Sequence, residues 1–150
     1  LFRERGAQHV LRLPDEPLPR PLRADSDRLT QVLLNLLSNA AKFVPGEGGR
    51  VELRLAADAA GVTVEVQDNG RGVPAEQQQL VFEKFRQGGD ALNRPQGTGL
   101  GLPISREIVE HFGGRMWLRS EPGLGACFAF TLPWDGAAAS QEPSEATAAP

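Results

Sequence analysis

The stretch over residues 31–43, QVLLNLLSNAAKF, most constrains the fold, because its apolar residues recur with a helical period. On a helix, at about 100° per residue, they form one broad apolar arc suited to packing against a core. The members of this arc are Leu29, Val32, Leu33, Leu36, Leu37, Ala40 and Phe43. Four polar residues, Gln31, Asn35, Asn39 and Lys42, share an adjoining arc. Amides and an ammonium are costly to bury without partners, so this polar arc either faces water or lines a polar site.

The ends of this helix follow from its flanking residues. Asp25, Ser26 or Asp27 can accept hydrogen bonds from the free N–H groups at the start of a helix, so one of them is expected as the N-cap. Pro45 disfavours helical geometry in the residue before it, so the helix should end near Val44.

Alternating apolar residues predict a sheet of about five strands. Residues 51–57 and 61–68 alternate strictly, so we expect them to pair as an antiparallel hairpin with one buried face. Residues 9–13 have the pattern of a short strand, which a proline-rich extended connection follows. Two more strands are predicted at residues 115–121 and 126–133, around the turn PGLG.

Two further helices and two irregular segments complete the prediction. A proline begins a short helix over residues 74–85, and residues 100–112 form a helix with Pro103 in its first turn and two glycines at its end. Residues 86–99 predict a long loop, and residues 134–150 have the composition of a disordered tail. The expected fold is an α/β (α+β) two-layer sandwich over residues 1–133, a mixed sheet of about five strands with three helices on one face.

Composition excludes several classes of function. A net charge of -3 argues against a nucleic-acid partner, which would require a basic excess. The single Cys127 leaves no internal disulfide and no Cys-based zinc site. No apolar run has the length of a membrane span, so we expect no membrane contact by this domain. Because the sequence begins at Leu1 rather than Met, we expect a piece of a longer protein, whose parent could carry a membrane segment elsewhere.

The motif DNGRG, residues 68–72, follows directly on a predicted strand. Asp68 would stand at the mouth of that strand, where a carboxylate can accept a hydrogen bond from an exocyclic amine such as that of adenine. Gly70 and Gly72 would let the backbone approach a ligand closely. The same residues also suit an ordinary Asp-Asn-Gly turn, so the motif alone leaves both interpretations open.

The motif GTGLG, residues 97–101, places three alternating glycines directly before a helix. Free N–H groups and the positive end of the helix dipole favour an anion at such a position. The spacing is neither the dinucleotide fingerprint nor a P-loop. The motif by itself therefore predicts either a phosphate site or a glycine-rich hinge.

The polar arc of residues 31–43 offers a third set of groups. Asn35 and Asn39 carry neutral oxygen ligands that suit a magnesium ion bridging phosphates, and Lys42 carries a point charge for phosphate. A solvated helix face remains the simpler interpretation of this arc when the helix is taken alone.

The set NLLSNAAKF, DNGRG, FEKF and GTGLGLPIS, in this order and at these distances, resembles the ATP-binding catalytic domain of sensor histidine kinases. The resemblance spans residues 8–133. That family belongs to the GHKL superfamily, so the resemblance implies a Bergerat-type fold with ATP and Mg²⁺ as cofactors. It also implies a cytoplasmic domain that transfers the γ-phosphoryl of ATP to a histidine on a dimerisation domain not present in this chain, with a response regulator downstream.

The resemblance also implies a role for each residue of the polar arc. Asn35 would hold Mg²⁺, Asn39 would contact the phosphates or the metal's shell, and Lys42 would pair with phosphate, which makes Asn35 and Lys42 the catalytic candidates. Phe43 would stack near the adenine.

The other motifs receive roles by the same resemblance. Asp68 would accept from the adenine amino group, with Gly70 and Gly72 shaping that wall of the site. Phe82 and Phe85 would anchor a mobile lid over residues 86–98. The nucleotide-binding residues on the phosphate side would be Gly97, Thr98, Gly99, Leu100 and Gly101.

Two departures from the family pattern bear on the mechanism. Arg86 directly follows the second phenylalanine, where many kinases have an aromatic residue and then Arg, so whether Arg86 or Arg94 reaches the γ-phosphate stays open. Gln31 stands where the superfamily's ATPases place a water-activating glutamate, which favours phosphoryl transfer over hydrolysis. The alternatives are a GHKL-type ATPase and a nucleotide-sensing binding module without transferase activity. Neither His9 nor His111 matches the family's phosphoacceptor.

Overall fold

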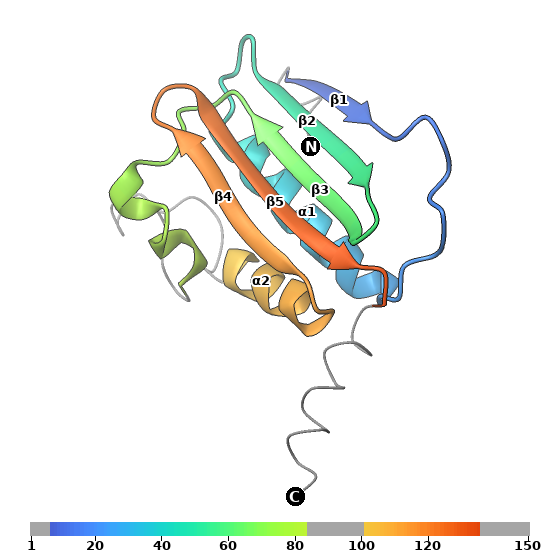
Figure 1. Ribbon diagram of the computed structural model, residues 1–150. Helices are drawn as coiled ribbons and strands as arrows, with labels where there is room; N and C mark the ends of the chain where they lie inside the picture. The colour runs from blue at the N-terminus through green and yellow to red at the C-terminus, as the bar shows by residue number, and fades with distance from the viewer. Residues whose placement is uncertain (1–6, 84–100, 136–150) are drawn as a thin grey trace, which may run out of the picture.

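The computed structural model describes residues 7–83 and 101–135, which form a five-stranded sheet with helices on one of its faces (Figure 1). The strands are β1 (Gln8–Arg12), β2 (Arg50–Ala57), β3 (Gly61–Asp68), β4 (Arg115–Glu121) and β5 (Gly125–Pro133). The helices are α1 (Ser26–Phe43) and α2 (Gly101–His111), with two short 3-10 helices, η2 (Ala75–Gln77) and η3 (Leu80–Phe82). No helix in these two ranges is long and apolar enough to span a lipid bilayer.

The sheet is mixed, as the sequence predicts. Its strand order is β1-β2-β3-β5-β4, with β1 parallel to β2 and every other neighbouring pair antiparallel. The β2–β3 hairpin aligns Val51 with Asp68 and Leu55 with Val64, so the apolar residues of both strands share one face. The two-layer α+β prediction is confirmed.

Helix α1 begins and ends where local chemistry requires. Among the three candidate N-caps, Asp25 is the one used, and its carboxylate accepts from the backbone N–H of Asp27 at 2.9 Å and of Arg28 at 3.3 Å. Val44 is extended (φ -71°, ψ 144°) ahead of Pro45, and this ends the helix. Both ends agree with the sequence prediction.

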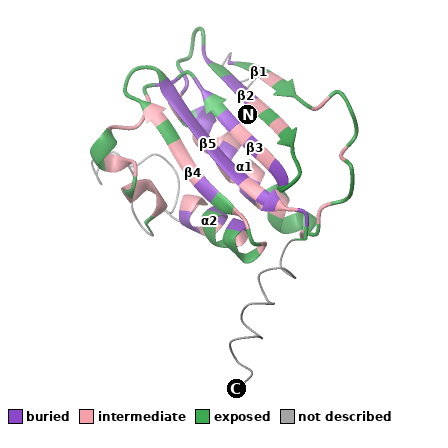
Figure 2. Ribbon diagram, viewed as in Figure 1, coloured by how far each residue is buried: buried purple, intermediate pink, exposed green. Residues whose placement is uncertain are grey.

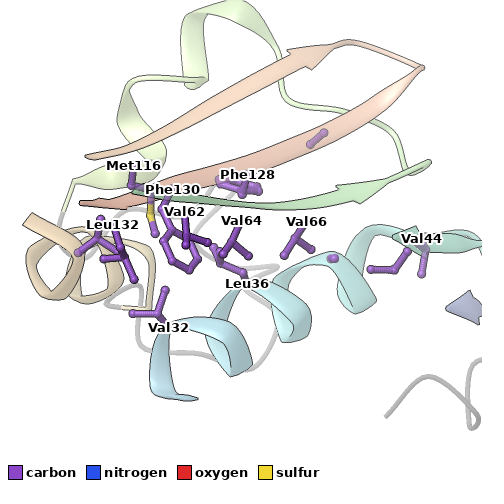
Figure 3. Close-up of a cluster of buried hydrophobic side chains, with 14 of the residues drawn as sticks. Val32, Leu36, Val44, Val62, Val64, Val66, Met116, Phe128, Phe130 and Leu132 are labelled. Atoms are coloured by element: carbon purple, nitrogen blue, oxygen red, sulfur yellow. The ribbon is translucent and has the colours of Figure 1, made fainter. Parts of the chain in front are cut away.

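The hydrophobic core lies between the two helices and the sheet. Val32, Leu36 and Ala40 of α1 are buried, and Figure 3 shows the first two pointing toward Val62 and Val64 of β3. Figure 2 shows that burial is concentrated in the central strands, whereas β1 is largely exposed. The apolar arc predicted for α1 is therefore the arc that packs against the sheet, which leaves the polar arc at the border of this interface.

The segment after DNGRG differs from the prediction. Instead of one short α-helix from Pro74, the described part forms the two 3-10 helices η2 and η3. The side-chain amide of Gln78 donates to the carbonyl oxygens of Val73 at 2.9 Å and Ser120 at 3.0 Å, so β4 holds this segment in a conformation set by tertiary contacts.

The end of the ordered domain also differs from the prediction. Trp134, assigned to the disordered tail, is buried: its indole Nε1 donates to the Asp58 carbonyl at 2.8 Å, and the Arg20 guanidinium lies 5.4 Å from the ring centroid. The packed domain thus extends past residue 133, because an indole with a polar partner is favourable to bury. The predicted loop over residues 86–99 and the tail after residue 135 lie outside the described residues.

Candidate functional site

Asp68 is a buried carboxylate at the end of β3, with only 2% of its surface exposed. Its Oδ1 accepts from the backbone N–H of Gly70 at 2.9 Å and of Ala126 at 3.3 Å. Burial raises the pKa of Asp68 above its ordinary value, and the two N–H donors oppose that shift only in part. Among the described residues, nothing donates to Oδ2. Within residues 7–83 and 101–135, Asp68 is thus a buried carboxylate with one oxygen left without a donor.

The glycines of DNGRG make close approaches, but to protein backbone. A Cβ on Gly70 would lie 2.4 Å from the Phe43 carbonyl oxygen, so the loop lies directly against the end of α1. Gly72 has φ +75°, which favours glycine, and a Cβ there would lie 2.5 Å from the Glu121 carbonyl oxygen. These contacts with the ends of α1 and β4 hold the loop that carries Asp68 in place, and the expected approach of Gly70 and Gly72 to a ligand stays a prediction.

Phe43, the last residue of α1, lies beside this loop and is half-buried. The guanidinium carbon of Arg71 lies 4.9 Å from the centroid of its ring, within the range of a cation–π contact. Arg71 was given no role from the sequence. Phe43 and Asp68, far apart in the sequence, are thus brought to one end of the site.

Asn35 lies two turns earlier on α1 and contacts the start of α2. Its Nδ2 donates to the Gly101 carbonyl oxygen at 3.2 Å and to Ser105 Oγ at 3.0 Å. A carbonyl can only accept, which assigns the amide orientation and leaves Oδ1 as the outward acceptor. Ser105 is fully buried and was missed in the sequence analysis; its only signal was a position one turn after Gly101, inside the quoted motif.

The remaining members of the polar arc lie along α1 between these two ends. Asn39 is half-buried, and its side chain has no hydrogen-bond partner within residues 7–83 and 101–135. Lys42 is exposed in the last turn of the helix. Gln31 Oε1 accepts from an Arg28 Nη at 3.5 Å on the same helix. The eight residue steps from Asn35 to Phe43 correspond to about 12 Å along the helix axis, which suits an extended nucleoside triphosphate.

Several predicted site residues cannot be placed. Gly97, Thr98, Gly99 and Leu100 lie outside the described residues, together with Phe85, Arg86 and Arg94. Phe82 is described, and its ring packs edge-on against Phe128 of β5 with the centroids 6.2 Å apart.

Comparison with known proteins identifies the family. Residues 24–136 match the model of the histidine kinase-, DNA gyrase B-, and HSP90-like ATPase family. An adaptive-response sensory kinase, SasA, of Parasynechococcus marenigrum is 48% identical over 115 residues, which cover 75% of this chain and 30% of that protein. The chain therefore spans about a third of the length of this relative.

Solved structures of histidine kinases have the same fold. The catalytic domain of the histidine kinase ThkA matches with a TM-score of 0.75 and 30% identity, over 89% of this chain and 84% of that domain. Full-length ShkA in complex with AMPPNP matches with a TM-score of 0.75 and 36% identity, over 88% of this chain and 26% of that protein. These matches confirm the resemblance inferred from the four motifs, and the chain belongs to the histidine kinase-, DNA gyrase B-, and HSP90-like ATPase family.

Proposed function

We propose that this chain is the ATP-binding catalytic domain of a sensor histidine kinase, which binds ATP with Mg²⁺ and delivers the γ-phosphoryl to a histidine. The observation that carries the proposal is Oδ2 of the buried Asp68, which has no donor among the described residues, at a loop packed against the Phe43 carbonyl. A buried carboxylate without a partner for one oxygen is costly, and an exocyclic amine of adenine would supply the missing donor. The AMPPNP named in the ShkA structure supports a nucleotide as the ligand.

The phosphate end of the proposed site lies at Asn35. Its Oδ1 is a neutral oxygen of the kind that Mg²⁺ accepts, and the ion would keep several waters and bind the phosphates at the same time. The chemistry that Mg²⁺ supplies when bound is neutralisation of the charge on the β- and γ-phosphates. Along the same helix, Asn39 would orient the phosphates and Lys42 would add positive charge.

The acceptor histidine and the downstream partner belong to other domains in this proposal. His9 lies on the edge strand β1 and His111 ends α2, and neither belongs to the proposed site. The phosphoryl group would pass to a histidine on the parent's dimerisation domain and then to a response regulator, in the cytoplasm. Gln31 pairs with Arg28 and is a weaker base than glutamate, which supports transfer to a protein acceptor over hydrolysis.

Titration calorimetry with AMP-PNP tests the nucleotide site. Binding is expected in the presence of Mg²⁺, with a weaker affinity when the metal is chelated. GMP-PNP is the matched control, because guanine presents a carbonyl where adenine presents its amine and should be repelled by the Asp68 carboxylate. Asn35→Ala should remove the Mg²⁺ dependence and leave adenosine binding unchanged. No binding of AMP-PNP at millimolar concentration would contradict the proposal.

A second measurement tests the transferase step. The parent's helical dimerisation domain, added in trans with ATP, should acquire phosphohistidine. Nucleotide binding without phosphohistidine would instead favour a nucleotide-sensing module, and ATP turnover in the absence of any acceptor would favour an ATPase.

A further inference from the structure

We infer that Ser105 is a positioning residue for the metal ligand Asn35: together with the Gly101 carbonyl it occupies the Asn35 amide nitrogen and so directs Oδ1 toward the phosphate end of the site. This inference rests on the proposed function, because it concerns how the chain prepares Asn35 for Mg²⁺. Ser105 is the last residue of the motif GTGLGLPIS, but the sequence alone gave it no role.

The surroundings of the Asn35 amide fix its orientation. A carboxamide has two N–H donors, and the structure shows two acceptors around Nδ2, Ser105 Oγ at 3.0 Å and the Gly101 oxygen at 3.2 Å. A flipped amide would set Oδ1 against the Gly101 carbonyl oxygen, which is repulsive. The Gly101 carbonyl, which can only accept, therefore selects one orientation of the Asn35 side chain before any ligand binds, and Ser105 Oγ holds that orientation with a second hydrogen bond.

The buried hydroxyl of Ser105 needs a hydrogen-bond partner. Ser105 is fully buried, as are Pro103 and Val109 on the same helix. Serine is a weaker helix former than alanine, and a buried hydroxyl costs free energy unless it is hydrogen-bonded. The contact with Asn35 compensates for that cost. Packing alone would be served as well by an apolar residue of similar size.

Both acceptors of the Asn35 amide belong to α2. Gly101 and Ser105 are one turn apart on α2, whereas Asn35 lies on α1, so the amide links the two helices at the point where both border the site. A Cβ on Gly101 would lie 3.9 Å from Asn35 Oδ1. This oxygen is therefore next to the N-terminus of α2, where the GTGLG motif ends. The metal ligand and the phosphate-side helix are therefore positioned by the same contacts.

Two variants at Ser105 separate hydrogen bonding from packing. Ser105→Ala removes the acceptor, and Ser105→Cys keeps nearly the same shape with a much weaker acceptor. The Mg²⁺-dependent gain in AMP-PNP affinity should fall on the order of tenfold in Ser105→Ala, the lower end of the range for partners of metal ligands, and should fall measurably in Ser105→Cys. Adenosine affinity should not change in either variant. Ser26→Ala, on the exposed first turn of α1, is the matched control and should behave as the parent chain.

A readout without nucleotide keeps this inference distinct from the proposed function. In the apo protein, the two Nδ2 protons of Asn35 should exchange slowly with solvent by NMR, and one should exchange faster in Ser105→Ala. If the parent chain binds no AMP-PNP, the proposed function fails, and rapid exchange of both protons in the apo parent would overturn the positioning role independently. Full Mg²⁺ dependence in both Ser105 variants would also overturn it.

Discussion

Two buried carboxylates on neighbouring strands of the same sheet have pKa values shifted in opposite directions. Asp68, at the end of β3 on the helix-covered face, is 2% exposed, and burial raises its pKa. Glu52, on β2 and on the open face, is 8% exposed, and its pKa is lowered to about 2, chiefly by the hydrogen bond from Arg54. Arg50 and Arg12 also donate to Glu52, at 3.1 Å and 2.8 Å.

The difference lies in what surrounds each charge. The oxygens of Glu52 are satisfied by guanidinium groups of its own chain, and the network continues from Arg54 through Glu65 to Arg119. Asp68 is given two backbone N–H donors on one oxygen and no cation among the described residues. The two carboxylates are similarly shielded from solvent, but the protein supplies donors to both oxygens of Glu52 and, among the described residues, to only one oxygen of Asp68. We take Asp68 to be the ligand group.

Substitution of Asp68 should produce the largest effect on function. Asp68→Asn can keep an oxygen toward the Gly70 and Ala126 N–H groups, but it would present an NH₂ donor to the adenine amine. AMP-PNP affinity should fall on the order of 100-fold, the scale of one lost hydrogen bond to a charged group. The melting temperature without nucleotide should stay the same or rise, because the desolvation cost of the carboxylate is removed. An equal loss of affinity and stability would show that Asp68 is mainly structural.

A smaller effect is expected from filling the space at Gly70. Gly70→Ala places a Cβ 2.4 Å from the Phe43 carbonyl oxygen and should displace the N–H that Asp68 accepts from, at a cost of about 1–3 kcal/mol in unfolding free energy. Gly101→Ala is the matched control, since its Cβ would meet nothing closer than 3.8 Å among the described residues. Urea unfolding of the two variants measures the difference. Equal stability of both would contradict the tight packing of the loop against α1.

The smallest expected effect is on the pH dependence of stability, to which Glu52 and Asp68 contribute with opposite signs. The folded pKa of Glu52 lies at about 2, below the ordinary value of 4.5, so its stabilising contribution is present above pH 4.5 and is lost as the pH falls toward 2. Asp68, with a raised pKa, has the opposite sign, because its protonation in acid favours the folded state.

Urea midpoints of the parent chain and Glu52→Gln, measured from neutral pH down through this window, test the assignment. The variant should be less stable than the parent at neutral pH and should lose stability less steeply in acid. Identical slopes would show that the arginines around Glu52 do not stabilise its charge. Glu47→Gln, in the exposed turn before β2, provides a control carboxyl group.

The sequence predicted the parts of the fold that depend on local chemistry. The helical period of residues 31–43, the cap at Asp25 and the stop at Pro45 are all read within one segment, so α1 was expected with nearly its observed ends. The strict alternation of β2 and β3 predicted their pairing and their buried face. Asn35 was singled out as a member of the polar arc and Asp68 as the first residue of DNGRG, and their specific roles came from the resemblance to the histidine kinase domain.

By itself, then, the sequence determined the elements, the mixed sheet with its helical layer and the residues on which a nucleotide site would depend. The tertiary structure decided how those residues are completed: Ala126 donates to Asp68 across 58 positions, and Ser105 accepts from Asn35 across 70. It also decided that Trp134 is buried and that the segment after Pro74 forms 3-10 turns. These contacts join segments that are distant in the chain. They depend on strand register and helix packing, and no local pattern of residues encodes them.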